Sequence, residues 1–339
     1  MFIGIIGPKS SGKHTIAEYL VNRHGFEFLT IRKNLDVYNR DVYSNARYFD
    51  NIDNMQVYVT ERWQDNFITC DIDCKDLDML RKRPFFLLLA VEAPVTMRYK
   101  RSVTRCEAQL EKKNSPSLEE FLIQDDRNIY NISAQDTQKT HCYKSLHNMM
   151  TSSDLIVTNA YQDVSSLYET LDKMNIVDKE RLRPSWDTYF MQLSDLAARR
   201  SNCMKRRVGC ILVKDSRVVA TGYNGTPRGL RNCNEGGCGR CNEGAPCGTG
   251  LDRCLCMHAE ENALLEAGRG SVNFETGVIL YCNTCPCLGC AIKIIQQGVK
   301  EVVYSKSYGM DEMTAKIFKE ANVKLRQHCP PSLRRDVDY

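Results

Sequence analysis

The second half of the chain carries three metal-binding side chains and one carboxylate, and their spacing constrains the fold more than any other feature. His258 and Glu260 lie two residues apart, and Cys287 and Cys290 follow Pro286 as a C-x-x-C pair. One neutral imidazole and two thiolates supply three ligands of a tetrahedral zinc ion and leave its fourth position open for water. We therefore expect a fold that brings these two segments together at one catalytic zinc ion.

The residues around these ligands favour catalysis as well as metal binding. Pro286 predicts a helix that starts there, and the partial positive charge of a helix N-terminus stabilises thiolates. Zinc lowers the pKa of bound water to about 7, and Glu260 can carry a proton from that water to a leaving amine. The H-x-E…P-C-x-x-C pattern is typical of zinc-dependent deaminases that act on cytosine-type bases. The alternative, a purely structural zinc site, requires a fourth protein ligand.

Cysteine usage divides the chain into two halves. Of 17 cysteines, four precede residue 184 and 13 follow it, six of them between Cys233 and Cys256. In a reducing compartment such cysteines are metal ligands more often than disulfides. The segment 178–184 is charged and ends on a proline, so we place a linker there. We expect domains at residues 1–178 and 184–327, followed by a tail at 328–339.

Both halves alternate strand and helix patterns, which is typical of α/β folds. In the first half, strands are predicted at 1–6, 85–91 and 154–158, and helices at 14–23 and 164–174. This alternation predicts a parallel three-layer α/β sheet, and the polar residues 105–145 are predicted to form helices or a mobile lid. In the second half the predicted order is α-β-β-α-β-α-β-α-β, from a helix at 186–199 to a strand at 323–326.

The N-terminal strand is followed by a glycine-rich loop. Gly7-x-x-x-x-Gly12-Lys13 resembles a P-loop, whose N–H groups and lysine hold phosphates. His14 replaces the hydroxyl residue that anchors Mg²⁺ in that motif, and Thr15 comes one residue late. Residues 93–101 resemble the lid of small-metabolite kinases such as dephospho-coenzyme A kinase. We expect either nucleotide binding by this loop or a degenerate domain that serves stability or assembly.

Several motifs of the second half resemble those of deoxycytidylate (dCMP) deaminases. They are Pro184-Ser-Trp-Asp-Thr-Tyr-Phe-Met, Arg207-Val-Gly-Cys-Ile-Leu-Val, Gly222-Tyr-Asn-Gly-Thr-Pro-Arg-Gly and His258-Ala-Glu-Glu-Asn-Ala. The resemblance covers residues 184–327 and is greatest to the fungal form, which carries an N-terminal P-loop domain. It implies a five-stranded mixed sheet flanked by helices, and hydrolysis of dCMP to dUMP and ammonia for thymidylate synthesis.

The resemblance also implies binding residues and partners. The residues implied to contact the substrate are Asn224 at its sugar, Tyr308 and Lys306 at its phosphate, and Ala259. The residues implied to hold an effector triphosphate with Mg²⁺ are Arg206, Arg207 and Gly225. Family members are commonly homohexamers that dCTP activates and dTTP inhibits. From the residues alone, the alternatives are that Asn224 makes a turn and that Lys306 is a solvated surface lysine.

A second, structural zinc ion is implied by the same resemblance. Microbial relatives place cysteines before Val-Gly, after Gly-Tyr-Asn-Gly and shortly before His-Ala-Glu. Carried over to this chain, the ligands are Cys203 and Cys233, with Cys238 or Cys241 and with Cys254 or Cys256. The set that we favour is Cys203, Cys233, Cys238 and Cys254. The alternative is a mobile loop with free thiols.

Charge and composition argue against several other classes of protein. The net charge is only +4, and the longest apolar run, Phe85–Val91, is too short to span a bilayer. The N-terminus lacks the basic lead of a secretory signal, so we expect a cytoplasmic protein, with the nucleus as an alternative, and no membrane partner. No basic, aromatic-rich stretch suggests strand binding, so no nucleic-acid partner is expected.

Two alternatives to dCMP deamination remain open. One is a deaminase of another cytosine or adenine nucleotide or of a base within nucleic acid, and the other is a regulatory protein with an inactive deaminase domain.

Overall fold

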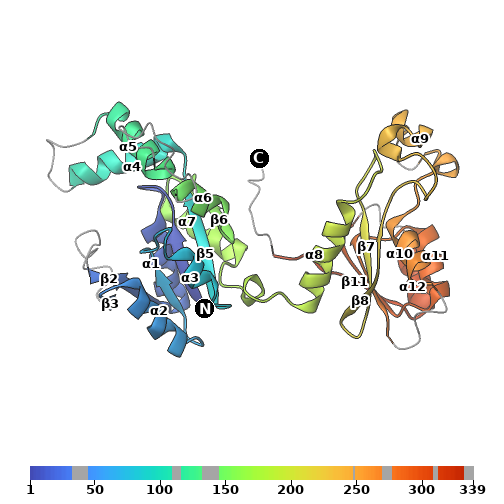
Figure 1. Ribbon diagram of the computed structural model, residues 1–339, viewed down its shortest axis with the longest axis horizontal. Coiled ribbons are helices and arrows are strands. Elements are labelled where there is room, and N and C mark those ends of the chain that lie inside the picture. The colour runs from blue at the N-terminus through green and yellow to red at the C-terminus, as the bar shows by residue number, and fades with distance from the viewer. Residues whose placement is uncertain are drawn as a thin grey trace. The chain divides into compact units, whose positions relative to one another are not determined.

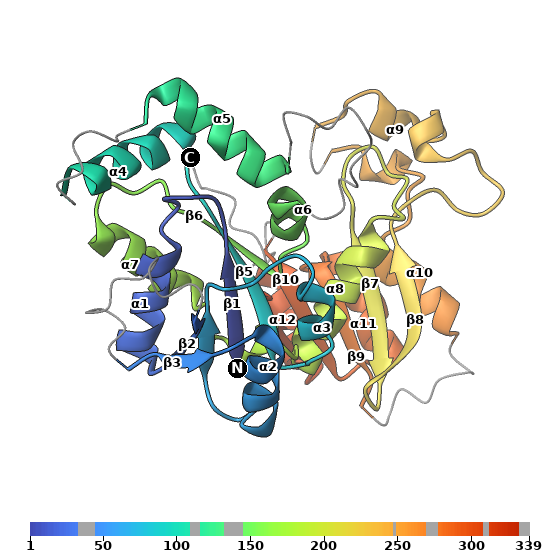
Figure 2. The same cartoon turned by 60° about the vertical axis from the view of Figure 1, so that its left-hand side comes forward.

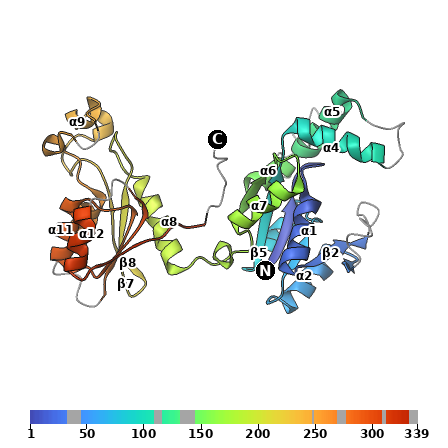
Figure 3. The same cartoon turned by 180° about the vertical axis from the view of Figure 1, so that it is seen from behind.

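The computed structural model describes residues 1–32, 45–108, 116–131, 145–246, 249–268, 277–307 and 312–331. Its internal contacts divide it into two compact units, Met1–Arg183 (unit 1) and Pro184–Pro331 (unit 2). Figures 1 and 3 show each unit as a β-sheet with helices on both faces. The boundary falls within the segment 178–184, where the sequence predicts a linker.

Unit 1 is built on a six-stranded sheet in which every neighbouring pair of strands is parallel. The strand order is β3-β2-β4-β1-β5-β6, so the N-terminal strand lies inside the sheet. Its inner strands are continuous apolar runs, as expected for strands that are buried on both faces. The strands are β1 (Phe2–Ile6), β2 (Glu27–Ile31), β3 (Arg47–Phe49), β4 (Phe67–Thr69), β5 (Phe86–Glu92) and β6 (Leu155–Thr158).

Helices cover both faces of this sheet and one of its ends. Helices α1 (Lys13–His24) and α7 (Val164–Met174) pack on one face around Ile5 and Leu20. Helices α2 (Ile52–Glu61), α3 (Leu77–Arg81) and α6 (Leu146–Thr151) pack on the other, around Met55 and Leu88. Beyond one end of the sheet lie α4 (Val95–Ala108) and α5 (Leu118–Tyr130) (Figure 2). A buried ion pair between Arg98 and Asp125 joins these two helices.

The predicted parallel α/β architecture of unit 1 is confirmed, and β1, β5, β6 and α7 lie where the sequence patterns predicted them. The strands β2, β3 and β4 were not predicted. The last two span only three residues each, too few to show an alternation over four to eight residues. Helix α5 and the end of α4 lie within the stretch 105–145, whereas residues 109–115 and 132–144 are outside the described ranges.

Unit 2 contains the predicted five-stranded mixed sheet, in the order β11-β10-β9-β7-β8. Strand β7 pairs antiparallel with β8 and β9, whereas β9, β10 and β11 run parallel. The β7–β8 turn places Asp215 and Ser216 in the left-handed backbone region. The strands are β7 (Gly209–Lys214), β8 (Arg217–Tyr223), β9 (Ile279–Thr284), β10 (Glu301–Lys306) and β11 (Lys324–Gln327).

Helix α8 (Trp186–Ala198) covers one face of this sheet, and three helices cover the other (Figures 1 and 3). The three are α10 (Ala259–Ala267), α11 (Leu288–Gln297) and α12 (Glu312–Glu320). The face under α8 is built from Phe190, Tyr281 and their neighbours, and the opposite core includes Ile294 and Phe318. In the described part of the chain, no helix has the length and apolar character needed to cross a membrane.

Candidate active site and metal centres

The predicted catalytic zinc ligands lie at the first turns of two neighbouring helices. His258 is the N-cap of α10, Cys287 is the N-cap of α11, and Cys290 follows in the first turn of α11. Both helices pack on the same face of the sheet. Their N-termini, which carry partial positive charge that favours thiolates, therefore lie beside one another.

The three ligand atoms converge as a zinc ion requires. His258 Nδ1 lies 3.2 Å from Cys290 Sγ and 3.4 Å from Cys287 Sγ, and all three ligand atoms lie within 4.8 Å of one another. Tetrahedral zinc with Zn–N of about 2.0–2.1 Å and Zn–S of about 2.3 Å places nitrogen and sulfur about 3.6 Å apart. The group therefore fits zinc bound through Nδ1. His258 and Cys287 are exposed and Cys290 is buried, so a fourth ligand can come from solvent.

Glu260 is the buried acid of this site. Its side chain is 4% exposed, and its carboxyl interacts with the Cys290 thiol. Burial raises the pKa of the Glu260 carboxyl, which is the direction that suits a group that accepts and donates protons near neutral pH. Hydrogen bonds with Cys290 and then with His258 lower the pKa of the Cys287 thiol, which favours the thiolate form that binds zinc.

Close backbone contacts hold His258 against the sheet. Gly225 and Met257 exchange two backbone hydrogen bonds of 3.2 and 2.9 Å, which fixes the residue before His258. A Cβ atom on Gly222 would lie 2.1 Å from the Ala259 carbonyl oxygen, so α10 can approach β8 because residue 222 is glycine. The Gly-Tyr-Asn-Gly motif therefore has a packing role next to a zinc ligand.

The residues implied to contact the substrate have distinct settings. The buried Asn224 side chain accepts a hydrogen bond from Val208 N and donates one to Arg206 O, both of 2.8 Å. Each amide atom retains capacity for one further bond. Lys306 is exposed at the end of β10, and its carbonyl accepts a 2.9 Å hydrogen bond from the amide of Cys285. Ala259 is fully buried, and Tyr308 lies outside the described residues.

The residues implied to bind an effector lie together. The Asn224 amide joins the backbone at Arg206 and Val208 to the loop that contains Gly225. A Cβ atom on Gly225 would lie 2.4 Å from Asn202 Oδ1, so this loop packs closely on the segment before β7. The Arg207 side chain is exposed. The geometry thus places both arginines and Gly225 in one neighbourhood.

The cysteine-rich loop contains two overlapping groups of sulfur atoms, and within each group every sulfur lies within 4.8 Å of the others. The first group is Cys203, Cys233, Cys241 and Cys256, and the second is Cys238, Cys241, Cys254 and Cys256. The set favoured from the sequence divides between the two groups, because Cys203 and Cys233 belong to the first and Cys238 and Cys254 to the second. Cys241 and Cys256, which the sequence left as alternatives, belong to both. We call these six residues the six-cysteine cluster.

Motif reasoning did not identify several polar residues that support the active site. Asn283 Oδ1 accepts a 3.1 Å hydrogen bond from Gly209 N, and its Nδ2 donates one of 3.1 Å to Asp195. Asn262 Nδ2 donates to the Tyr223 carbonyl at 2.9 Å. Asn283 interrupts an otherwise apolar strand, and a buried amide in such a run is a signal for a hydrogen-bonding role.

In unit 1, the loop from Gly7 to Lys13 joins β1 to α1, as the P-loop motif requires. Lys13 Nζ donates to the carbonyl oxygens of Gly7 at 2.6 Å and Pro8 at 3.1 Å, so its own loop holds the lysine. Burial lowers the pKa of the His14 imidazole to about 4, and His14 is therefore neutral near pH 7. Thr15 and Gly12 are half-buried in the same turn.

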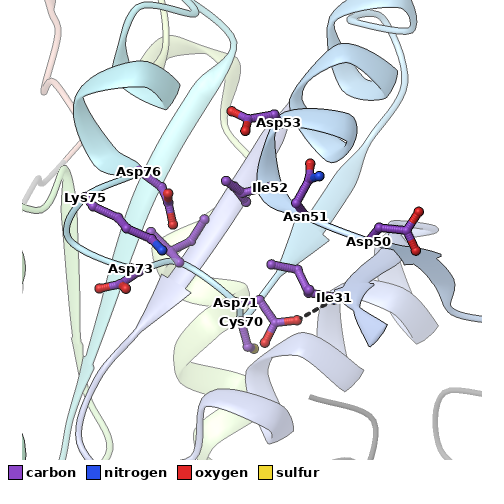
Figure 4. A pocket seen from close by; sticks show the side chains of 11 residues that line it. Ile31, Asp50, Asn51, Ile52, Asp53, Cys70, Asp71, Asp73, Lys75 and Asp76 are labelled. Atoms are coloured by element: carbon purple, nitrogen blue, oxygen red, sulfur yellow. Dashed lines mark hydrogen bonds between the residues drawn. The ribbon is translucent and has the colours of Figure 1, made fainter. Parts of the chain in front are cut away.

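A pocket of about 570 Å³ lies in unit 1 near this loop (Figure 4). Its lining residues Cys70 and Asp71 directly follow β4, which pairs in parallel with β1, so they lie at the same edge of the sheet as the loop that follows β1. The charged residues that line the pocket are Asp50, Asp53, Asp71, Asp73, Lys75 and Asp76. This excess of carboxylates favours cations over a bare phosphate.

Comparisons with known proteins find one matching family and relatives that are similar over nearly the whole chain. Residues 184–306 match the family described as "Cytidine and deoxycytidylate deaminase zinc-binding region". The deoxycytidylate deaminase of Schizosaccharomyces pombe is 44% identical over 331 residues, which cover 97% of this chain and 98% of that protein. The deoxycytidylate deaminase of Saccharomyces cerevisiae is 40% identical over 333 residues, 96% of each chain. A solved dCMP deaminase from the cyanophage S-TIM5, in complex with dCMP and dUMP, is 29% identical, with a TM-score of 0.34; the match covers 41% of this chain and 94% of that chain.

The matched family and the His258–Cys287–Cys290 site on a mixed sheet define unit 2 as a zinc-binding deaminase domain. The likeness to the two yeast proteins extends over nearly the full length of all three chains. The chain therefore belongs to the deoxycytidylate deaminase family.

Proposed function

We propose that this protein hydrolyses dCMP to dUMP and ammonia at the His258–Cys287–Cys290 site. The observation that carries the proposal is a group of three zinc ligands, two of them exposed, with the buried carboxylate of Glu260 beside it. Structural zinc sites have four protein ligands, whereas catalytic sites keep one position open. Relatives named as deoxycytidylate deaminases support the choice of substrate.

The side chains divide the chemistry among them. Zinc at this site supplies Lewis acidity that lowers the pKa of water to about 7. His258 Nδ1 and the sulfurs of Cys287 and Cys290 would hold the ion. Glu260 takes a proton from the attacking water and passes it to the ring nitrogen of the base. It then takes the second proton from the hydroxyl group that has added to the ring and gives it to the leaving amine. Its burial excludes competing solvent from these transfers.

Substrate recognition is proposed for residues around the ligands. Asn224 contacts the sugar through its spare hydrogen-bonding capacity, and Ala259 contacts the base region through its backbone. Lys306 and Tyr308 bind the phosphate, which is supported by the exposed position of Lys306 at the end of β10. The Cys285–Lys306 backbone hydrogen bond relates this position to the C-x-x-C segment.

Regulation and assembly are also proposed, by resemblance. A triphosphate with Mg²⁺ would bind at Arg206, Arg207 and Gly225, with dCTP as activator and dTTP as inhibitor, in a cytoplasmic or nuclear homohexamer. The shared neighbourhood of these residues supports a single effector site. A second zinc function is proposed at the six-cysteine cluster, where it would order the surrounding loop.

The Gly7–Lys13 loop is proposed as a degenerate phosphate site. A ligand there would have to displace the hydrogen bonds of Lys13 to Gly7 and Pro8. His14 offers no hydroxyl for Mg²⁺, which phosphoryl transfer requires. We therefore assign unit 1 no phosphoryl-transfer activity.

Ammonia release from dCMP, CMP, deoxycytidine, cytosine and a cytosine-containing oligonucleotide, each with and without dCTP, tests the proposal. We expect dCMP to have the highest kcat/KM, because the phosphate and the deoxyribose both contribute binding. Preference for deoxycytidine or cytosine would contradict the phosphate contacts. Preference for the oligonucleotide would favour the alternative deaminase of bases within nucleic acid.

A further inference from the structure

The six-cysteine cluster has the geometry of two metal sites rather than one. Cys241 Sγ lies 3.9 Å from Cys203 Sγ, 3.8 Å from Cys254 Sγ and 3.9 Å from Cys256 Sγ. Four sulfurs at about 2.3 Å from a tetrahedral zinc ion lie about 3.8 Å from one another. The observed separations therefore match the edge length of a zinc–sulfur tetrahedron. Cys241 keeps this distance to members of both groups, since Cys203 belongs to the first group and Cys254 to the second.

The two groups share Cys241 and Cys256, so their tetrahedra share one edge. A single zinc ion would use four of the six sulfurs and leave two thiols beside it without a metal. Two zinc ions use all six, with Cys241 and Cys256 as bridging ligands. The terminal ligands are then Cys203 and Cys233 on one ion, and Cys238 and Cys254 on the other.

Hydrogen-bond donors surround the terminal sulfurs. Cys233 Sγ accepts from Met204 N at 3.4 Å, and Cys238 Sγ accepts from Leu255 N at 3.4 Å. Arg240 Nη1 lies 3.7 Å from Cys254 Sγ. Six thiolates exceed the charge of two Zn²⁺ ions, so the cluster carries net negative charge that these donors offset. Such partners are the usual second layer of a metal site.

Among its described residues, the loop around the cluster has no buried apolar core other than the cysteines. The buried residues of its core are all cysteines, namely Cys233, Cys238, Cys241 and Cys256, with Cys203 and Cys254 packed against them. The larger apolar side chains nearby, such as Leu230, Leu251 and Leu255, are exposed. The elements in the described part of the loop are the short helices η4 (Cys233–Glu235), α9 (Gly239–Asn242) and η5 (Leu251–Arg253). Metal binding is the force that can order such a segment.

We infer that the six-cysteine cluster binds two zinc ions as one binuclear thiolate centre with Cys241 and Cys256 as bridges. The inference deepens the proposed structural zinc function and does not depend on the deaminase chemistry. The centre also supports the active site, because Cys256 is two residues from His258 and Met257 pairs with Gly225. Its role there is to position His258.

Zinc content of the purified full chain, measured by mass spectrometry of the metal under reducing conditions, tests this inference. We expect about three zinc ions per chain, one at the active site and two in the cluster. Cys203→Ala and Cys254→Ala should both lower the count, and Cys241→Ala should lower it to about one. The matched control is Cys329→Ala, an exposed cysteine of unit 2 outside the cluster, which should keep the full count.

A count of about two in the wild-type chain, with either Cys203→Ala or Cys254→Ala leaving it unchanged, would overturn the inference in favour of a single four-cysteine site. X-ray absorption of the wild-type chain gives an answer even if the variants misfold. A zinc–zinc scattering shell is expected, and its absence contradicts the bridge. His258→Ala should remove one ion and all activity but keep that shell, which separates this inference from the proposed function.

Discussion

The two cysteine sites of unit 2 differ in what positions their sulfur atoms. Cys287 and Cys290 lie at the start of a helix that packs on a sheet through an extensive aliphatic core. The six-cysteine cluster lies among very short helices, and its core consists of the cysteines themselves. The fold therefore builds the first site before metal binds, whereas metal builds the second. An open site formed by a fold can serve catalysis, and a closed site formed by its ligands serves structure.

The largest loss of activity should follow from replacement of a zinc ligand at the His258–Cys287–Cys290 site. We expect Cys287→Ser to lose the active-site zinc and reduce dUMP formation to background, because no other group generates the nucleophile. The fold should remain, since Cys287 is exposed and contributes little packing. Zinc content, circular dichroism and an activity assay on the same sample check this. A variant that loses its secondary structure would contradict the view that the fold builds this site.

Replacement of a bridging cysteine in the six-cysteine cluster should have the opposite effect, with local unfolding but no loss of the active-site zinc. We expect Cys241→Ala to unfold the loop around the cluster while the active-site zinc remains. Activity should fall by about 10–100-fold, the usual cost of losing a supporting shell, because the segment that leads into His258 loosens. Hydrogen exchange of residues 224–257 compared with β9 measures the local effect. Unchanged exchange in the loop would mean that metal does not order it.

The packing of α10 on β8 should be sensitive to a single methyl group. Gly222→Ala places a Cβ atom 2.1 Å from the Ala259 carbonyl oxygen, and we expect a loss of about 1–3 kcal/mol from overpacking. The matched control is Gly289→Ala in α11, where no atom lies within 4 Å of the added carbon. Helix propensity favours that control by up to about 1 kcal/mol. Urea unfolding followed by Trp186 fluorescence in a Trp63→Phe background compares the two, and equal stabilities would refute the close-approach argument.

The smallest effect on dCMP deamination is expected from a substitution in unit 1. Lys13 is held by carbonyl oxygens of its own loop, and the zinc chemistry of unit 2 needs no group from it. We expect Lys13→Ala to keep kcat and KM for dCMP within about 2–3-fold, the scatter of contributions that do not touch the reaction. Steady-state kinetics with and without dCTP measure this. Loss of the response to dCTP would identify the loop as a regulatory site instead.

The zinc signature was informative from sequence because each of its elements has a local physical cause. Pro286 and the cysteines after it predict a helix start, and the structure begins α11 at Leu288 with Cys287 as its N-cap. The strand and helix order of unit 2 follows from apolar patterns of ordinary length. In unit 1, β3 and β4 are too short to show any pattern, and only the tertiary sheet identifies them.

The cysteine cluster shows where sequence reasoning stops. Spacing indicated that cysteines of this loop bind metal, but it could not decide between Cys238 and Cys241 or between Cys254 and Cys256. The choice depends on how the turns fold in three dimensions, and the structure places Cys241 and Cys256 in both groups. The role of Asn283 was hidden for the same reason, because its partners Gly209 and Asp195 are distant in sequence.

The most direct test of the account compares dUMP formation from dCMP by the wild-type chain and by Glu260→Gln, with zinc content measured on the same samples. Because Glu260 carries the protons of the reaction, we expect activity to fall by about 10²–10⁴-fold while zinc content stays at the wild-type level. The neighbouring Glu261→Gln is the control, since Glu261 makes a partly exposed ion pair with Lys293 and should retain nearly full activity. A Glu260→Gln variant within a few-fold of the wild type would contradict the proposed mechanism.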